Sequence, residues 1–222
     1  MKYYIIHYTK CPERKQRMLD QLTPMGIDPE WITEYDKENP LISQIKLKTG
    51  STMSLGLISC SIKHFVAMKR MIDHDIPEAI ILEDDCIFYP EFALAKPNHP
   101  SGFLRLGLGI GHLEEVKPPP GLKVYRLSNP AGSEAQWVTQ EFARVSISNV
   151  NLDHAIDMFQ YAIMVNMFRE DMRCMNLCYQ TSLVDRESSV TDGNESDVDW
   201  KDYCKTFLQR KRYSLQSLLS LQ

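Results

Sequence analysis

The sequence predicts an α/β fold, in which helices flank a central sheet, and two patterns support this class. The apolar run at residues 79–82 lies between Pro77 and three acids, and a run so short is typical of a strand covered on both faces. The strand-like residues 2–8 lead directly into an amphipathic helical pattern, which is the start of a β-α unit. Open sheets of this class bind ligands just beyond the carboxyl ends of their strands, where the three acids fall.

The size and charge of the chain limit the hypotheses about function. With 222 residues it is long enough for one substantial domain, so we expect a single domain over residues 1–222. Its hydrophobic content of 43% and charged content of 24% are ordinary for a soluble globular protein. The net charge of −4 gives no overall field that would attract nucleic acid or an anionic membrane.

The N-terminus and the cysteines indicate a cytoplasmic location. The apolar part of residues 1–8 is too short for a signal peptide, and no stretch approaches the length of a membrane span. The six cysteines are scattered without a Cys-x-x-Cys pair, so we expect reduced thiols.

The first helix is expected to begin at Pro12, which suits a first helical turn, and Glu13 complements the helix dipole there. Gly26 marks the end of this segment. Arg14 lies near the helix start. It either reaches a nucleotide or phosphate at the strand–helix junction or belongs to a solvated helix face.

Residues 27–50 show little periodicity, so we expect a short strand around residues 31–33 followed by a loop. Ser54 is an N-cap candidate for a helix over residues 55–73, whose apolar residues recur at spacings of three and four. His64 falls near the middle of that helix. A lone helical histidine is more often structural than catalytic, and both roles remain open.

The acids at the end of the run are the centre of the functional hypothesis. Alternation along an extended chain lets Glu83 and Asp85 point one way and Asp84 the other. Two carboxylates on one side make a hard-oxygen site for Mg²⁺ or Mn²⁺, ions that commonly take further ligands from substrate phosphates. The alternative is a solvated acidic turn, although residues 86–88 return at once to apolar character. The metal hypothesis points to transfer at a diphosphate-bearing substrate.

The second half of the chain continues the alternation of strands and helices. A helix is expected over residues 151–168, with Asp153 and Asp157 one turn apart on one side of it. A mobile acidic loop is expected near residues 185–199 and a basic helix over residues 200–221, whose basic side is a solvated surface, a cover for an anionic donor or a contact with a partner or membrane surface. Strands are expected at residues 103–107, 122–127 and 172–179, while residues 136–150 are ambiguous between strand and helix.

Three segments together resemble glycosyltransferase family 25, which includes lipooligosaccharide galactosyltransferases and procollagen galactosyltransferases. They are Tyr4-Ile5-Ile6-His7-Tyr8 with Pro12-Glu13-Arg14, then Ser54-Leu55-Gly56-Leu57-Ile58-Ser59-Cys60 running to His64, then Ile80-Ile81-Leu82-Glu83-Asp84-Asp85. Residues 155–159 are similar to a later segment of the family that contains a Val-Asp pair.

The resemblance implies a GT-A type, Rossmann-like nucleotide-diphospho-sugar transferase fold with a mixed sheet. It further implies a UDP-sugar donor, Mn²⁺ or Mg²⁺ dependence, and inverting transfer of galactose or glucose to a hydroxyl of a glycan or protein, with lipopolysaccharide biosynthesis as one setting.

The resemblance and the residue patterns together assign candidate roles. Asp85 and Glu83 are the expected metal ligands. The expected base is Asp157, with Asp153, Glu141 and His64 as alternatives. Residues expected to contact the donor are His7, Tyr8, Arg14, Glu83 and Asp84.

The chain departs from the family pattern at three positions. It has His7, Ser59 and Lys63 where the family usually has Asn, Gly and Ser. Two alternatives therefore stay open: a non-catalytic nucleotide-sugar-binding module, and another divalent-metal enzyme of phosphoryl or nucleotidyl transfer that uses the same acids.

Overall fold

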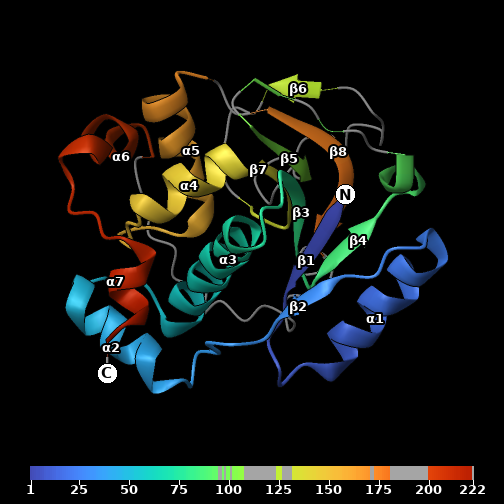
Figure 1. The fold of residues 1–222 in the computed structure, drawn as a ribbon, viewed down its shortest axis with the longest axis horizontal. Helices are drawn as coiled ribbons and strands as arrows, with labels where there is room; N and C mark the ends of the chain where they lie inside the picture. The colour runs from blue at the N-terminus through green and yellow to red at the C-terminus, as the bar shows by residue number, and fades with distance from the viewer. Residues whose placement is uncertain are drawn as a thin grey trace.

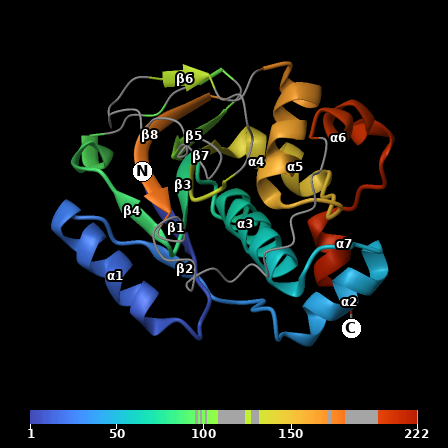
Figure 2. The ribbon, with the colours of Figure 1, turned by 180° about the vertical axis from the view of Figure 1, so that it is seen from behind.

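A mixed sheet forms the centre of the computed structural model, and helices cover both of its faces (Figures 1 and 2). The structure describes residues 1–94, 97, 99–100, 102–107, 124–126, 132–170, 173–180 and 200–221. The expected acidic loop near residues 185–199 lies outside these ranges.

The strand order is β2-β1-β3-β7-β5-β8-β4, with β6 paired to β8 beside this path. β1 is parallel to β2 and β3, and β7 is antiparallel to β3 and β5. β8 is parallel to β5 and antiparallel to β4 and β6, so the sheet is mixed. The strands are β1 (Lys2–Ile6), β2 (Glu30–Ile32), β3 (Glu78–Glu83), β4 (Cys86–Phe88), β5 (Phe103–Gly107), β6 (Val124–Arg126), β7 (Ala135–Thr139) and β8 (Arg173–Gln180).

The sheet curls back on itself at the acidic residues. Only Asp84 and Asp85 separate β3 from β4, yet β4 stands at the far end of the strand order. Gln21 holds β4 against the first helix, because its amide donates to the carbonyl of Cys86 (3.1 Å) and accepts from the amide of Phe88 (3.0 Å). The turn at Asp84 and Asp85 therefore joins a strand in the middle of the sheet to the last strand of the order.

The helices form two unequal layers. α1 lies on one face of the sheet, while α3, α4 and α5 lie on the other (Figure 1). No helix in the described ranges is both long and apolar enough to cross a membrane. The helices are α1 (Pro12–Leu22), α2 (Pro40–Thr49), α3 (Leu55–Asp73), α4 (Gln140–Ser148), α5 (Ile156–Ile163), α6 (Trp200–Thr206) and α7 (Leu215–Leu219), and a π-helical turn (Met164–Phe168) follows α5.

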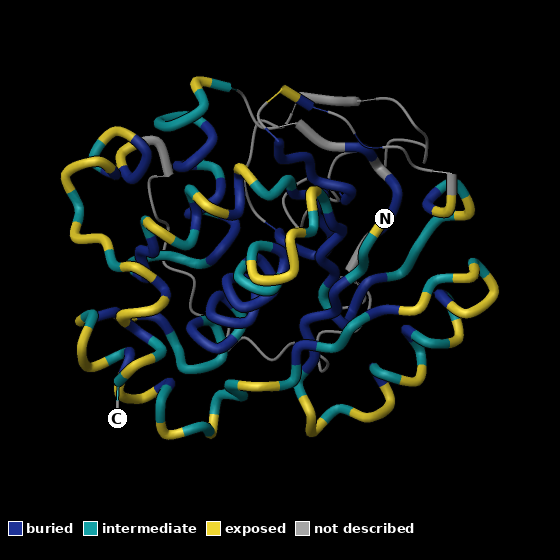
Figure 3. The backbone as a smooth tube through the Cα atoms, in the orientation of Figure 1, coloured by how far each residue is buried: buried dark blue, intermediate teal, exposed yellow. Residues whose placement is uncertain are grey.

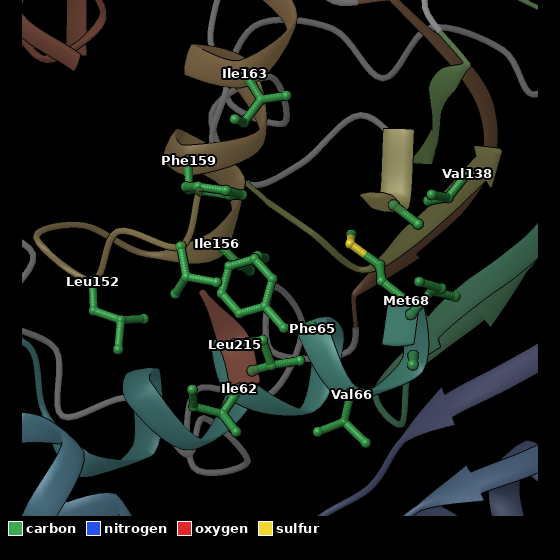
Figure 4. Close-up of a cluster of buried hydrophobic side chains, with 14 of the residues drawn as sticks. Ile62, Phe65, Val66, Met68, Val138, Leu152, Ile156, Phe159, Ile163 and Leu215 are labelled. Atoms are coloured by element: carbon green, nitrogen blue, oxygen red, sulfur yellow. The ribbon is translucent and has the colours of Figure 1, made fainter. Parts of the chain in front are cut away.

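The larger core lies between the sheet and α3. This helix is buried along most of its length, as the dark-blue segment in Figure 3 shows. Phe65 of α3 points toward Phe159 of α5 (Figure 4), and their rings meet edge to face with centroids 5.0 Å apart. A smaller cluster, which includes Met18 and Leu22 of α1, covers the other face. Exposed residues lie on the outer surfaces of α1 and α2 and along the C-terminal segment with α6 and α7.

Three expectations about helices are corrected. The segment after β2 holds α2 instead of a loop, with Asn39 as its N-cap and Gly50 in the left-handed conformation at its end. The helix expected over residues 151–168 begins only at Ile156, so Asp153 precedes it. The expected helix over residues 200–221 is broken into α6 and α7, because the chain is extended at Arg210 and restarts at the Ser214 cap.

The layered core leads to a stability prediction. Phe65→Ala should lower the free energy of unfolding by about 3–5 kcal/mol, because it removes a fully buried ring from the contact between α3 and α5. The matched control is Leu47→Ala on α2, where the side chain is 86% exposed and the change should stay within about 0.5 kcal/mol. Urea unfolding followed by circular dichroism measures both, and equal losses would contradict this assignment of the core.

Candidate functional site

The site lies where the carboxyl ends of β1 and β3 meet. The parallel register places Ile6 beside Glu83, and the amide of Asp84 donates to the carbonyl of Ile6 (3.1 Å). On the other side, the amide of Glu83 donates to the carbonyl of Glu134 (2.8 Å). Backbone hydrogen bonds to β1 on one side and to Glu134 on the other therefore hold the main chain of Glu83 and Asp84 in place.

Asp84 points toward the β1–α1 connection. Its Oδ2 lies 2.7 Å from Nδ1 of His7 and accepts from the amide of Tyr8 (3.1 Å), while Oδ1 accepts from Nη1 of Arg14 (3.1 Å). Burial would raise the pKa of Asp84, but the bond to His7 and the charge of Arg14 outweigh it and lower that pKa. Both oxygens are engaged by protein groups, so Asp84 ties β3 to the start of α1.

Glu83 points the opposite way, toward α3. Its Oε1 lies 3.1 Å from Nε2 of His64 and 3.6 Å from Sγ of Cys60, and it also accepts from the hydroxyl of Ser133. Burial would raise the pKa of Glu83, but the hydrogen bonds from His64 and Ser133 lower it overall. Glu83 is therefore a charged group held in one orientation.

Asp85 differs from Glu83 and Asp84 in its hydrogen bonding. The residue is only 8% exposed, and its Oδ1 has no hydrogen-bond partner in the described part of the chain. Burial and the charge of Glu83 raise the pKa of Asp85 to about 8. A cation would relieve both effects, and carboxylate oxygens are the ligands that Mg²⁺ and Mn²⁺ prefer. Asp85 together with Glu83 thus fits a divalent cation.

Asp157 is linked to the acids through two consecutive residues. Its Oδ2 accepts from the amide of Gly132 (2.8 Å), and the next residue, Ser133, donates to Glu83. Gly132 has a φ of 94°, a conformation that favours glycine. The link brings the first turn of α5 toward the carboxyl end of β3.

The other candidate bases lie in different surroundings. Asp153 accepts from Asn151 (3.1 Å) and from Arg210 (3.2 Å), which ties it to the C-terminal segment. Glu141 is exposed in the first turn of α4. His64 is fully buried behind Glu83. The expectation that Asp153 and Asp157 share one helix face is wrong, because only Asp157 belongs to α5.

The remaining residues expected to contact a donor divide into two groups. His7 and Arg14 are buried behind Asp84. Tyr8 points outward, and its hydroxyl donates to Glu38 (2.6 Å). Glu38 lines an open cavity of about 460 Å³, a size typical of small-molecule sites, together with Lys37, Ser43, Ser54, Leu55 and Gly56.

The three departures from the family pattern lie around one loop. Lys63 is 2% exposed and donates both to the carbonyl of His7 and to Asp36. Ser59 donates to the carbonyl of Tyr35 (2.6 Å), a residue in the left-handed region with φ of 64°. These contacts fix the loop after β2 against β1 and α3.

Sequence reasoning did not find Ser133, Cys60 or Asp36 as parts of this site. The contacts that bring them in join residues 23 to 50 positions apart. Cys60 carried a local signal, since it lies one helical turn before His64 on the expected helix. Ser133 and Asp36 carried none.

Comparisons with known proteins point to one family. Residues 1–110 match the family model described as "Glycosyltransferase family 25 (LPS biosynthesis protein)". A curated protein of Aedes aegypti, "Glycosyltransferase 25 family member", is 26% identical over 103 residues. That match covers 40% of this chain and 17% of the relative, so the chain spans only a small part of the relative's length. All three acids fall within the family match, as do the residues that support them, apart from Gly132, Ser133, Glu134 and Asp157.

The environment of Asp85 predicts how stability depends on pH. Its pKa is about 8 in the folded chain against an ordinary 3.8, so between these values the folded state binds more protons than the unfolded state. The free energy of unfolding therefore falls as pH rises through this window. Asp85→Asn should remove this loss and be more stable than the native chain by on the order of 1–3 kcal/mol at about pH 9, with a much smaller difference at about pH 4.

Urea unfolding in the presence of a chelator measures this difference across the pH range. A gap between the two proteins that does not change with pH would contradict the assigned environment of Asp85.

Proposed function

The chain belongs to glycosyltransferase family 25 through its residues 1–110, and from this premise we propose that it is a metal-dependent inverting glycosyltransferase. The proposed donor is a UDP-sugar, with galactose or glucose as the sugar. The proposed acceptor is a hydroxyl of a glycan, lipopolysaccharide included, or of a protein. We also assign the α/β fold to the GT-A type, a view supported by the parallel β2-β1-β3 unit and the acids at its carboxyl end.

The observation that carries this proposal is the state of Asp85. A buried carboxyl group whose Oδ1 has no hydrogen-bond partner in the described residues, next to a charged and oriented Glu83, is costly to ionise in the free protein. A divalent cation held by Asp85 and Glu83 would supply charge neutralisation for a departing diphosphate. A bound cation would remove the electrostatic cost of ionised Asp85 beside Glu83, and this relief would favour binding of the cation.

The donor is proposed to lie between the acids and the cavity beside Tyr8. Tyr8 and the cavity residues Lys37 and Ser54 offer an aromatic face, a cation and a hydroxyl for a nucleotide. His7 and Arg14 act indirectly in this scheme, because they hold Asp84 and thereby the turn that presents Asp85. Their role is to position the acids.

Inversion requires a base that takes the proton of the acceptor hydroxyl. We assign this role to Asp157, because Gly132 and Ser133 connect it to Glu83 while a backbone amide orients each of its oxygens. Asp153 is engaged by Arg210, and His64 is enclosed behind Glu83, so both are weaker candidates.

The first test measures release of UDP from a panel of UDP-sugars, with Mn²⁺ or with chelator. Release from one donor should require the metal and should fall at least about 100-fold in Asp85→Ala, because the variant loses a metal ligand. Asp20→Ala, which removes an exposed acid on α1, is the matched control and should behave as the native chain. Metal-dependent donor binding without turnover across many acceptors would favour the non-catalytic binding module instead.

The second test concerns the base. Asp157→Asn should lower kcat by about 10²–10⁴-fold with little change in the KM for the donor, since a general base acts on the acceptor. The pH profile of kcat should lose its rising limb in the variant. If Asp153→Asn reproduces these effects and Asp157→Asn does not, the assignment of the base is wrong.

A further inference from the structure

We propose that Cys60, His64 and Glu83 form a binding site for a thiophilic divalent cation, with Zn²⁺ as the fitting ion, and that this site shares Glu83 with the proposed oxygen site at Asp85. Within the described ranges, these residues offer a sulfur, a nitrogen and an oxygen atom that all lie within 4.8 Å of one another. The binding itself does not depend on the proposed transfer reaction.

The distances match a tetrahedral zinc site. With zinc–sulfur bonds of about 2.3 Å and zinc–nitrogen and zinc–oxygen bonds of about 2.0 Å, sulfur and oxygen ligands lie about 3.5 Å apart, and nitrogen and oxygen ligands about 3.3 Å apart. The separations here are 3.6 Å from Cys60 Sγ to Glu83 Oε1 and 3.1 Å from His64 Nε2 to the same oxygen. Two of the three ligand–ligand distances are thus close to those of a zinc site, and the third, from Cys60 Sγ to His64 Nε2, is at most 4.8 Å.

The backbone supplies the rigidity that such a site needs. Cys60 and His64 are four residues apart on α3, so their side chains emerge from the same face of one buried helix. Glu83 comes from the end of β3, and the hydroxyl of Ser133 fixes its carboxylate from outside the cluster. Three protein ligands leave the fourth position open, and the intermediate exposure of Cys60 and Glu83 gives access to it.

The choice of ion follows from the ligands. A thiolate and an imidazole select Zn²⁺ over Mg²⁺ and Mn²⁺, which prefer oxygen. Burial and the charge of Glu83 keep the Cys60 thiol protonated in the free protein, since both raise its pKa well above the ordinary value. On binding, the cation takes the place of the thiol proton, which passes to solvent, so that one proton is released from Cys60 for each ion bound.

One consequence does rest on the proposed function. Glu83 is a proposed ligand of the donor-bound cation, so an ion held by Cys60 and His64 would withdraw it from that role. Zn²⁺ should therefore inhibit Mn²⁺-dependent donor turnover, and this inhibition should require Cys60.

The test is a titration of the full chain with Co²⁺ as a spectroscopic probe for the zinc position, under reducing conditions. The expected result is a sulfur-to-cobalt charge-transfer band together with visible bands of tetrahedral cobalt, both displaced by Zn²⁺. Cys60→Ser should abolish the charge-transfer band and weaken Zn²⁺ binding by at least about 10-fold, and His64→Gln should weaken it similarly. Cys11→Ser removes a thiol of similar exposure outside the cluster and should leave the spectrum unchanged.

The outcomes separate this proposal from the proposed function. Zn²⁺ binding that is unchanged in both Cys60→Ser and His64→Gln, with both variants folded by circular dichroism, overturns the zinc site whether or not the chain turns over a donor. A Cys60-dependent cobalt spectrum in a chain that neither binds nor hydrolyses any UDP-sugar establishes the zinc site and overturns the proposed function.

Discussion

The electrostatic cost of three consecutive carboxylates at the end of one buried strand dictates what surrounds them. Like charges this close cannot all remain ionised in a poorly solvated place unless each finds a counter-charge or a donor. Asp84 is paired with Arg14 and hydrogen-bonded to His7 on one side, and Glu83 is held by His64 and Ser133 on the other. Oδ1 of Asp85 has no hydrogen-bond partner in the described residues, so of the three acids Asp85 has the least compensation for the cost of its burial.

The fold can serve the acids on both sides because of where β3 ends. α1 and α3 cover opposite faces of the sheet, and successive side chains of an extended strand alternate between those faces. Arg14 therefore approaches from the α1 layer and His64 from the α3 layer, while the curl into β4 closes the end of the strand. Side chains of β3 alternate between the two hydrophobic cores, and this alternation continues into the turn. Glu83 therefore contacts the α3 layer, whereas Asp84 contacts the α1 layer.

The elements that depend on neighbouring residues in the chain could be predicted from the sequence. The β1–α1 unit, α3 with its Ser54 cap, and β3 with its acids follow from periodicity, capping and turn residues, and the structure confirms them. α2 was missed although Asn39, Pro40 and Gly50 carry its capping signals, because its apolar periodicity is weak. Ser133 and Asp36 could not be found, since their roles depend on strand order and on loops that meet only in the folded chain. Asp153 was misplaced because a continuous helical pattern did not reveal where α5 begins.

The ion pair between Lys63 and Asp36 limits which substitutions these two positions can accept during evolution. The ammonium group of Lys63 is almost wholly buried and bonds both to Asp36 and to the carbonyl of His7. Loss of Asp36 alone would leave this buried ammonium group without its counter-charge, a penalty of about 3–5 kcal/mol, which is a large share of a typical domain's stability. Loss of Lys63 alone costs less, because Asp36 is partly exposed and also accepts from Thr9. Replacement of both together would avoid that penalty. Asp36 is therefore constrained for as long as Lys63 is present, and its replacement is expected together with, or after, that of Lys63.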